Sequence, residues 1–142
     1  MEYRNPVPTV DLIIRLPDGV VIIERKNEPL GYALPGGFVD EWEPVEKAAV
    51  REAQEETGLT VTLDELFYVY SNPERDPRRH TISVVFLAHA DANPVAGDDA
   101  SAVHVVPEAE LRNYEMAFDH GTIVSEYLEF RRSGQRPLHS PT

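Results

Sequence analysis

The segment from Gly37 to Leu59 reads GFVDEWEPVEKAAVREAQEETGL, and its part from Pro44 to Thr57 predicts a helix. Pro44 suits the first helical position, and Gly58 is a typical residue at which a helix ends. Glutamates before and within the first turn interact favourably with the positive N-terminal end of the helix dipole. Apolar residues recur every fourth position and form a thin stripe: Val45, Ala49 and Ala53. The segment therefore predicts a loop and one helix that packs on a core through a narrow face.

Acidic residues cluster near the C-terminal end of this helix. Glu52 and Glu56 are four residues apart and Glu55 lies beside them, so their carboxylates share one side. Like charges at this spacing cost about 0.2–0.5 kcal/mol per pair in an isolated helix. A hard divalent cation, which prefers oxygen ligands, would turn that repulsion into attraction. The alternative is an ordinary solvated acidic face on which Arg51 and Glu55 form an exposed salt bridge.

The spacing of the whole segment resembles the Nudix box, written G-x5-E-x7-R-E-U-x-E-E-x-G-U with U aliphatic. Every defined position matches: Gly37, Glu43, Arg51, Glu52, Ala53, Glu55, Glu56, Gly58 and Leu59. The order of the expected strands around the segment is also similar to that of Nudix domains. The resemblance implies an α/β (α+β) fold, a Nudix-like α/β/α sandwich with a mixed β-sheet. It also implies a pyrophosphohydrolase that acts on phosphoanhydride bonds.

The same resemblance implies a metal site on the helix. Glu52 and Glu56 are expected to be the main ligands of Mg²⁺, with Mn²⁺ as a possible substitute. Glu55 is expected to be either a third ligand or the general base, and the carbonyl of Gly37 to join the metal shell. Metal ions neutralise diphosphate oxygens and activate water, and a carboxylate can accept the proton of that water. No covalent intermediate is needed.

Two further box residues are expected to act through the metal ligands. By resemblance, Arg51 and Glu43 hold each other and orient the acidic helix. The box glycines permit a tight loop against the helix, where a Cβ would intrude.

Strands are expected on both sides of the box. Runs rich in Val, Ile and Leu or aromatic residues predict strands over residues 9–16, 20–24, 32–34, 61–70, 81–89 and 103–106. Pro35-Gly36-Gly37 is expected to break the third of these. A helical turn over residues 107–111 and a closing helix over residues 118–131 complete the pattern. Tyr68 and Tyr70 should share one strand face, with Phe67 and Val69 on the other.

Length and charge limit the classes of function. The chain of 142 residues fits a single domain over residues 1–132, followed by a polar and flexible tail over residues 133–142. The absence of cysteine excludes a disulfide framework and suits a cytoplasmic location. A net charge of −12 disfavours nucleic-acid and anionic-membrane partners. The resemblance implies a small nucleotide as the partner. A homodimer is left open.

Stretches outside the box core resemble the ADP-ribose pyrophosphatase branch, whose members split ADP-ribose into AMP and ribose 5-phosphate. They are RKNEP at residues 25–29, ALPGGFVD at 33–40, SNPERDPR at 71–78 and AFDH at 117–120. Loops at residues 71–80 and 91–101 are long enough to wall a substrate groove. The alternatives are a pyrophosphohydrolase for nucleoside triphosphates or nucleotide sugars, and a non-catalytic Nudix domain that senses a ligand.

Cations and one tryptophan are the candidates for substrate binding. Arg25, Arg78 and Arg79 could bind phosphates, as could Arg75, or all could be solvated charges. Trp42 could be a platform for adenine, although a loop anchor is favoured. Trp42 and Arg79 both stand where the ADP-ribose branch often has glycine, which puts bulk near the substrate.

Late acidic and histidine residues have simpler interpretations. Asp98 and Asp99 could supply a base from a mobile loop, but a turn-forming acidic pair is favoured. The histidines lack a shared metal-ligand spacing, and each is expected to be structural or at the surface: His89, His104 and His120.

Overall fold

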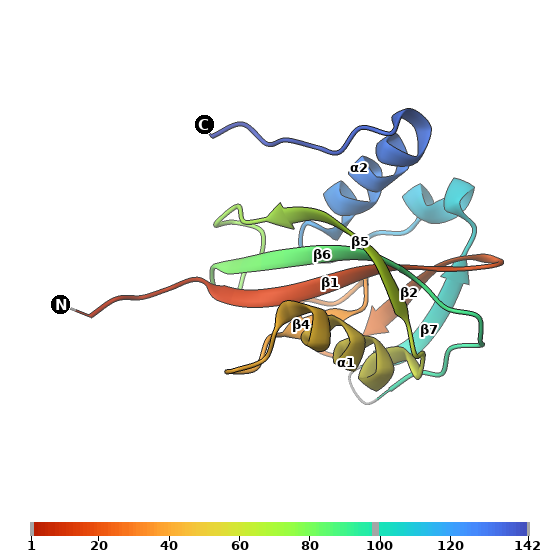
Figure 1. Ribbon diagram of the computed structural model, residues 1–142, viewed down its shortest axis with the longest axis horizontal. Helices are drawn as coiled ribbons and strands as arrows, with labels where there is room; N and C mark the ends of the chain where they lie inside the picture. The colour runs from red at the N-terminus through yellow and green to blue at the C-terminus, as the bar shows by residue number, and fades with distance from the viewer. Residues whose placement is uncertain (1, 98–99, 142) are drawn as a thin grey trace.

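The computed structural model describes residues 2–97 and 100–141, and it places one mixed β-sheet between two helices (Figure 1). The elements in chain order are β1 (Val7–Leu16), β2 (Gly19–Arg25), β3 (Tyr32–Ala33), β4 (Gly36–Phe38), α1 (Val45–Thr57), β5 (Thr62–Tyr70), β6 (Thr81–His89), β7 (Ala100–Val106), the 3-10 helix η1 (Glu108–Asn113) and α2 (His120–Ser133). The helices α1 and α2 cover opposite faces of the sheet. The expected α/β/α sandwich with a mixed sheet is confirmed.

Strand β1 is the centre of the sheet. It pairs in parallel with β6 along its length, from Val7 opposite Thr81 to Arg15 opposite His89. Its other edge is shared, because β4 pairs antiparallel with its first half and β2 with its last two residues. Strand β2 then pairs with β3 and β7, and β5 pairs with β6. Strands β2 and β4 therefore pair with the same edge of β1, but with different parts of it.

Pro35-Gly36-Gly37 follows the end of β3, as expected, but Gly36 and Gly37 then form with Phe38 the strand β4, which was not predicted. A Cβ on Gly36 would lie 2.1 Å from the carbonyl oxygen of Val10 on β1. Only glycine permits this approach, so the residues that suggested a break in fact allow close strand pairing.

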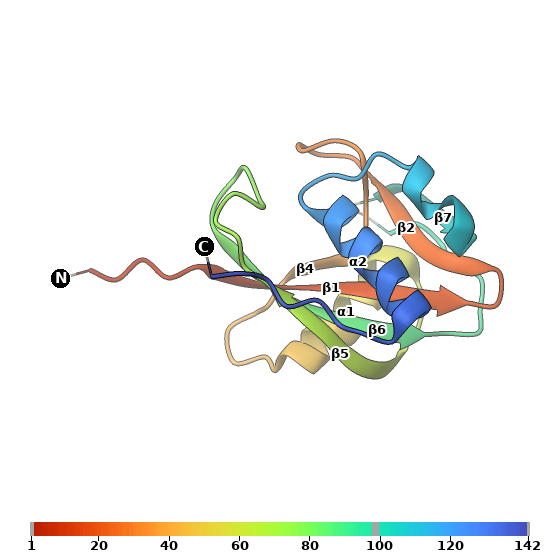
Figure 2. The ribbon, with the colours of Figure 1, turned by 90° about the horizontal axis from the view of Figure 1, so that it is seen from above.

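Alternation along β1 assigns its side chains to the two helices. Val10, Leu12 and Ile14 pack in one buried cluster with the alanines of α1. Ile13 packs in the other cluster, with the side chains of α2. Successive strand residues point to opposite faces, so Asp11 lies on the α2 side of the sheet. Figure 2 shows α2 lying across that face.

A bulge in β5 changes the expected faces of its aromatic residues. The register with β6 shifts between Leu66 and Tyr68, which leaves Phe67 as the extra residue. Phe67 and Tyr70 are consequently both buried in the α2-side cluster, while Val69 is exposed. The simple alternation predicted for residues 67–70 is therefore wrong at this bulge.

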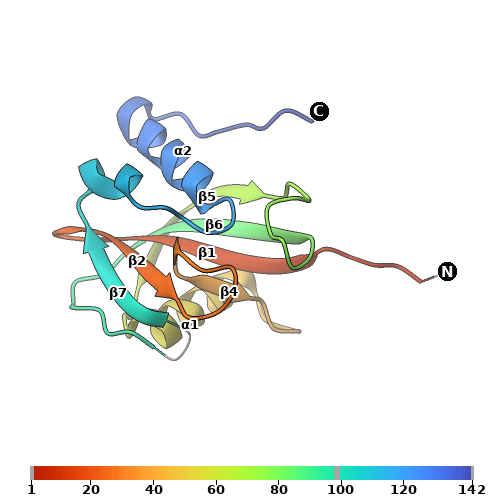
Figure 3. The same ribbon diagram turned by 180° about the vertical axis from the view of Figure 1, so that it is seen from behind.

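The segment after α2, expected to be flexible, returns beside β5 (Figure 3). The backbone N–H of His139 donates to the Tyr68 hydroxyl at 2.6 Å, and its ring lies 2.9 Å from a Glu126 carboxylate oxygen.

In the described part of the chain, no helix is long and apolar enough to cross a membrane.

Candidate active site

The acidic face of α1 lies directly against β4. The backbone N–H of Gly36 donates to Oε1 of Glu56 at 2.7 Å, and Glu56 is only 6% exposed. A Cβ on Gly37 would lie 2.5 Å from the carboxyl carbon of Glu52. Gly36 and Gly37 therefore each contact one of the expected metal ligands, and a side chain at Gly37 would displace the carboxylate of Glu52.

Arg51 joins the loop before α1 to the acidic face of the helix. Its guanidinium donates to both oxygens of Glu43, at 2.8 and 2.9 Å, and to the Phe38 carbonyl at 3.0 Å. It also donates to Glu52 at 2.7 Å and to Glu55 at 3.2 Å. The hydrogen bond from Arg51 lowers the pKa of Glu43 from 4.5 to about 2, and the same bond raises the pKa of Arg51. The expected Arg51–Glu43 pair is present and fully ionised at neutral pH.

The carboxylates of α1 do not form a ready-made cage. Among the described residues, no three acidic or histidine side chains converge as a metal site. The reason is that each carboxylate has a hydrogen-bond donor of its own. Arg51 donates to Glu52 and Glu55, and the backbone N–H of Gly36 donates to Glu56. The donors nevertheless fit a hard divalent cation, because several carboxylate oxygens lie on one helix face beside the main chain of Gly37.

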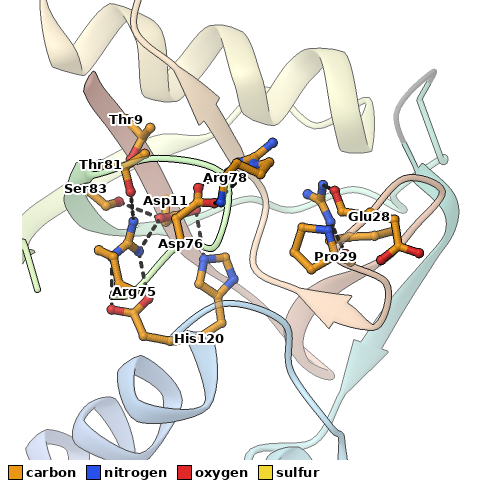
Figure 4. Close-up of polar contacts among 12 residues, drawn as sticks. Thr9, Asp11, Glu28, Pro29, Arg75, Asp76, Arg78, Thr81, Ser83 and His120 are labelled. Carbon is orange, nitrogen blue, oxygen red and sulfur yellow. Dashed lines mark hydrogen bonds and ion pairs between the residues drawn. The ribbon is translucent and has the colours of Figure 1, made fainter. Parts of the chain in front are cut away.

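A narrow cleft opens where β2 and β4 diverge from β1, and Gly37 and Glu56 line one side of it. Figure 4 shows the polar residues around it, including Asp11, Arg78 and His120. The cleft encloses about 50 Å³. The box thus meets a cavity that contains both acidic and basic side chains.

Three of the candidate arginines line this cleft: Arg25, Arg75 and Arg78. Arg25 and Arg78 both line it, and both guanidinium groups lie over the ring of Phe118, at 4.7 and 5.1 Å from its centroid. Arg78 is also held by Asp76 through two hydrogen bonds of 3.0 and 2.9 Å. Arg79, by contrast, is exposed and does not line the cleft. The structure thus brings Arg25, Arg75 and Arg78 to the cleft but not Arg79.

Two expectations are corrected by burial. Trp42 is 91% exposed, so it does not anchor its loop. The side chain of Arg75 is only 3% exposed, and it donates to both oxygens of Asp119 and to the Thr81 hydroxyl. Arg75 is therefore neither a solvated charge nor a surface phosphate ligand. It ties the loop at residues 71–80 to the start of α2.

The loop at residues 91–101, after β6, was expected to form a wall of the substrate groove, but it has a different role. In its described residues it does not line the cleft. Instead, Val95 donates its backbone N–H to the Thr57 carbonyl at 2.7 Å, and Gly97 donates to the Glu56 carbonyl at 2.9 Å. It closes the C-terminal end of α1. Asp98 and Asp99, the candidate base, lie outside the described residues.

Two cleft residues were missed or misjudged in the sequence. Asp11 lines the cleft and is buried, and its signal was a single acid inside the apolar run of β1. His120 is also buried and lines the cleft, so of the two alternatives only the structural one holds for it. His89 and His104 do lie at the surface, paired with Asp64 and Glu24.

Substitutions at the two glycines should separate folding from activity. Gly36→Ala places a Cβ against the backbone of β1 and should lower the free energy of unfolding by about 1–3 kcal/mol. Gly37→Ala meets only the movable end of Glu52, so it should fold well but lose about 10- to 100-fold in turnover. Thermal unfolding and steady-state kinetics measure the two effects. Equal losses of stability in both variants would contradict the assignment.

Comparison with known proteins agrees with this geometry. The NUDIX domain model matches residues 5–127. The chain is 43% identical over 133 residues to the ADP-ribose pyrophosphatase of Methanocaldococcus jannaschii, covering 91% of this chain and 77% of the relative.

Solved structures share the fold. A NUDIX hydrolase from Nitrosomonas europaea superposes with a TM-score of 0.83 at 29% identity, covering 97% of this chain and 78% of that one. A bifunctional NMN adenylyltransferase/ADP ribose pyrophosphatase from Francisella tularensis, complexed with AMP and a Mn ion, gives 0.80 at 29% identity. That match covers 91% of this chain but only 43% of the longer protein. On the domain match and the 43% identity to a relative covered over 77% of its length, this chain belongs to the Nudix family of pyrophosphohydrolases.

Proposed function

We propose that this protein hydrolyses the diphosphate of ADP-ribose to AMP and ribose 5-phosphate, using Mg²⁺ or Mn²⁺. The observation that carries the proposal is the junction of the box with the cleft. Gly37 and Glu56 line the same cavity as Arg25 and Arg78. The proposed metal-binding face and the guanidinium groups of Arg25 and Arg78 therefore surround one space. The 43% identity to an ADP-ribose pyrophosphatase supports the choice of substrate.

The proposed roles of the box residues follow their positions. Glu52, Glu56 and the carbonyl of Gly37 would hold the metal ion. When bound, the ion offsets the charge of the diphosphate oxygens and lowers the pKa of water. Glu55 has a side chain that is 57% exposed, so it can exchange protons with solvent, and we assign it the general-base role. Arg51 keeps these carboxylates in place through Glu43.

Charge explains why cations are needed at the cleft. The chain carries a net charge of −12, which repels a diphosphate. Arg25 and Arg78 are placed by Phe118 and by hydrogen bonds to Pro29 and Asp76, and we propose that they contact the substrate phosphates. Trp42, in the part of the box that precedes α1, and Arg79, which follows Arg78, are both exposed. Their proposed contacts would be with the outer parts of the substrate.

A substrate panel tests the proposal. The protein with Mg²⁺ is offered ADP-ribose, ATP, an 8-oxo-purine triphosphate, ADP-glucose and a dinucleoside polyphosphate, and kcat/KM is measured for each. We expect ADP-ribose to exceed every triphosphate by about tenfold or more, which corresponds to about 1.4 kcal/mol of transition-state binding. A triphosphate with the highest kcat/KM would contradict the substrate assignment while leaving the metal chemistry intact.

A further inference from the structure

A hydrogen-bond donor and an acceptor lie side by side at the inner end of the cleft. The backbone N–H of Leu34 donates to Nδ1 of His120 at 3.0 Å, so Nδ1 carries no proton and Nε2 holds the hydrogen. Nε2 lies 3.4 Å from Oδ1 of Asp11. Both residues are buried, and both line the cleft (Figure 4). The cavity therefore ends in one N–H and one carboxylate oxygen.

The two groups are fixed from behind. Oδ2 of Asp11 accepts a hydrogen bond of 2.5 Å from the Ser83 hydroxyl, and Arg75 lies 3.7 Å away. Arg75 is itself held by Asp119, the residue before His120. Ser83 and Arg75 both contact Oδ2 of Asp11, so the other carboxylate oxygen, Oδ1, faces His120. The pair is thus placed before any ligand arrives, which reduces the cost of binding.

The contact between the pair is weak, and the walls beside it are suited to a flat ring. A separation of 3.4 Å is longer than a normal N–H···O bond, so both groups can still bond a third partner. Phe38 and Phe118 line the same cavity together with Ile23 and Leu34. Bases stack on aromatic rings and on guanidinium planes, so these walls suit the flat face of a base.

We infer that this inner end is the base-recognition site of the nucleotide, with Asp11 and His120 reading the edge of the base. The choice of adenine as the base rests on the proposed function. Asp11 accepts a hydrogen bond from the exocyclic amino group of adenine, and His120 donates one to the adjacent ring nitrogen. The cavity of about 50 Å³ is far below the roughly 300 Å³ of typical ligand sites. Binding of a base therefore requires the lining to open, and Arg78 and Phe118, which are not buried, are the side chains proposed to move.

Product binding tests the inference without catalysis. AMP, inosine monophosphate and ribose 5-phosphate are titrated into the protein with Mg²⁺ by calorimetry. Inosine monophosphate exchanges donor and acceptor at the same edge. We expect the wild type to prefer AMP by about tenfold or more over both other ligands. Asp11→Asn offers both a donor and an acceptor, so the preference for AMP over inosine monophosphate should fall below about threefold.

Further variants make the result decisive. His120→Gln keeps a donor and an acceptor and should retain most of the AMP affinity, whereas His120→Leu should lose about tenfold. Ser83→Ala disturbs Asp11 from behind without changing the cavity lining, and it should keep the preference for AMP. A wild type that binds ribose 5-phosphate as tightly as AMP, or an Asp11→Asn protein with unchanged selectivity, would overturn the inference.

The outcome is separable from that of the proposed function. Failure of ADP-ribose turnover in the wild type counts against the proposed function, and the product titrations still decide on the base site. Circular dichroism and thermal unfolding confirm that each variant is folded. If Asp11→Asn does not fold, the contrast between His120→Gln and His120→Leu decides the inference alone.

Discussion

In excess EDTA, the protein should hydrolyse no measurable ADP-ribose, and Mg²⁺ added beyond the chelator should restore full turnover. The physical reason is charge. Glu52, Glu55 and Glu56 share one helix face in a chain of net charge −12, and a diphosphate cannot approach that face without a compensating cation. The rate of AMP formation is measured by chromatography at each free metal concentration.

Two controls accompany the chelation experiment. Circular dichroism in EDTA should be unchanged, because α1 is packed through its alanines and its carboxylates already have protein partners. EDTA saturated with Mg²⁺ beforehand should not inhibit. Full turnover in excess chelator would refute a metal-assisted mechanism.

Glu56→Gln should lower kcat at least about 100-fold, which corresponds to about 2.7 kcal/mol in the activation barrier. The substitution removes a charged oxygen from the proposed metal shell. It keeps the shape of the side chain, and its amide oxygen can still accept the bond from Gly36. The free energy of unfolding should therefore remain close to that of the wild type, which denaturant titration measures.

A matched control lies on the same helix. Glu46 is exposed in the first turn of α1 and does not line the cleft, so Glu46→Gln makes the same chemical change away from the site. Its kcat should stay within about twofold of the wild type. A near-normal rate for Glu56→Gln, or equal losses in both variants, would move the metal site away from this part of α1.

Local sequence rules predicted the elements that depend on neighbours in the chain. The stop of α1 at Gly58 follows from its left-handed backbone, φ +70°, which glycine adopts without strain. The stripe of Ala49 and Ala53 is fully buried as the helical period predicts. The pairing of Arg51 with Glu43, eight residues apart, was expected from the resemblance to the Nudix box and not from a local rule.

Features that depend on distant parts of the chain were not predictable in the same way. Asp11 and Ser83 are 72 residues apart, and Arg75 and Asp119 are 44 apart. Their contacts arise because β1 pairs with β6 and because α2 begins above them. Nothing in the sequence near Arg75 distinguishes a buried clamp from a surface phosphate ligand.

Product analysis of ADP-ribose hydrolysis with Mg²⁺ tests the central claim most directly. Phosphorus NMR with chromatography identifies what the wild type releases, and the Glu56→Gln protein is run beside it. The account predicts AMP and ribose 5-phosphate in equal amounts from the wild type, and a trace of both from the variant. Intact ADP-ribose in the wild-type reaction, alongside a nucleoside triphosphate cleaved with release of pyrophosphate, would contradict it.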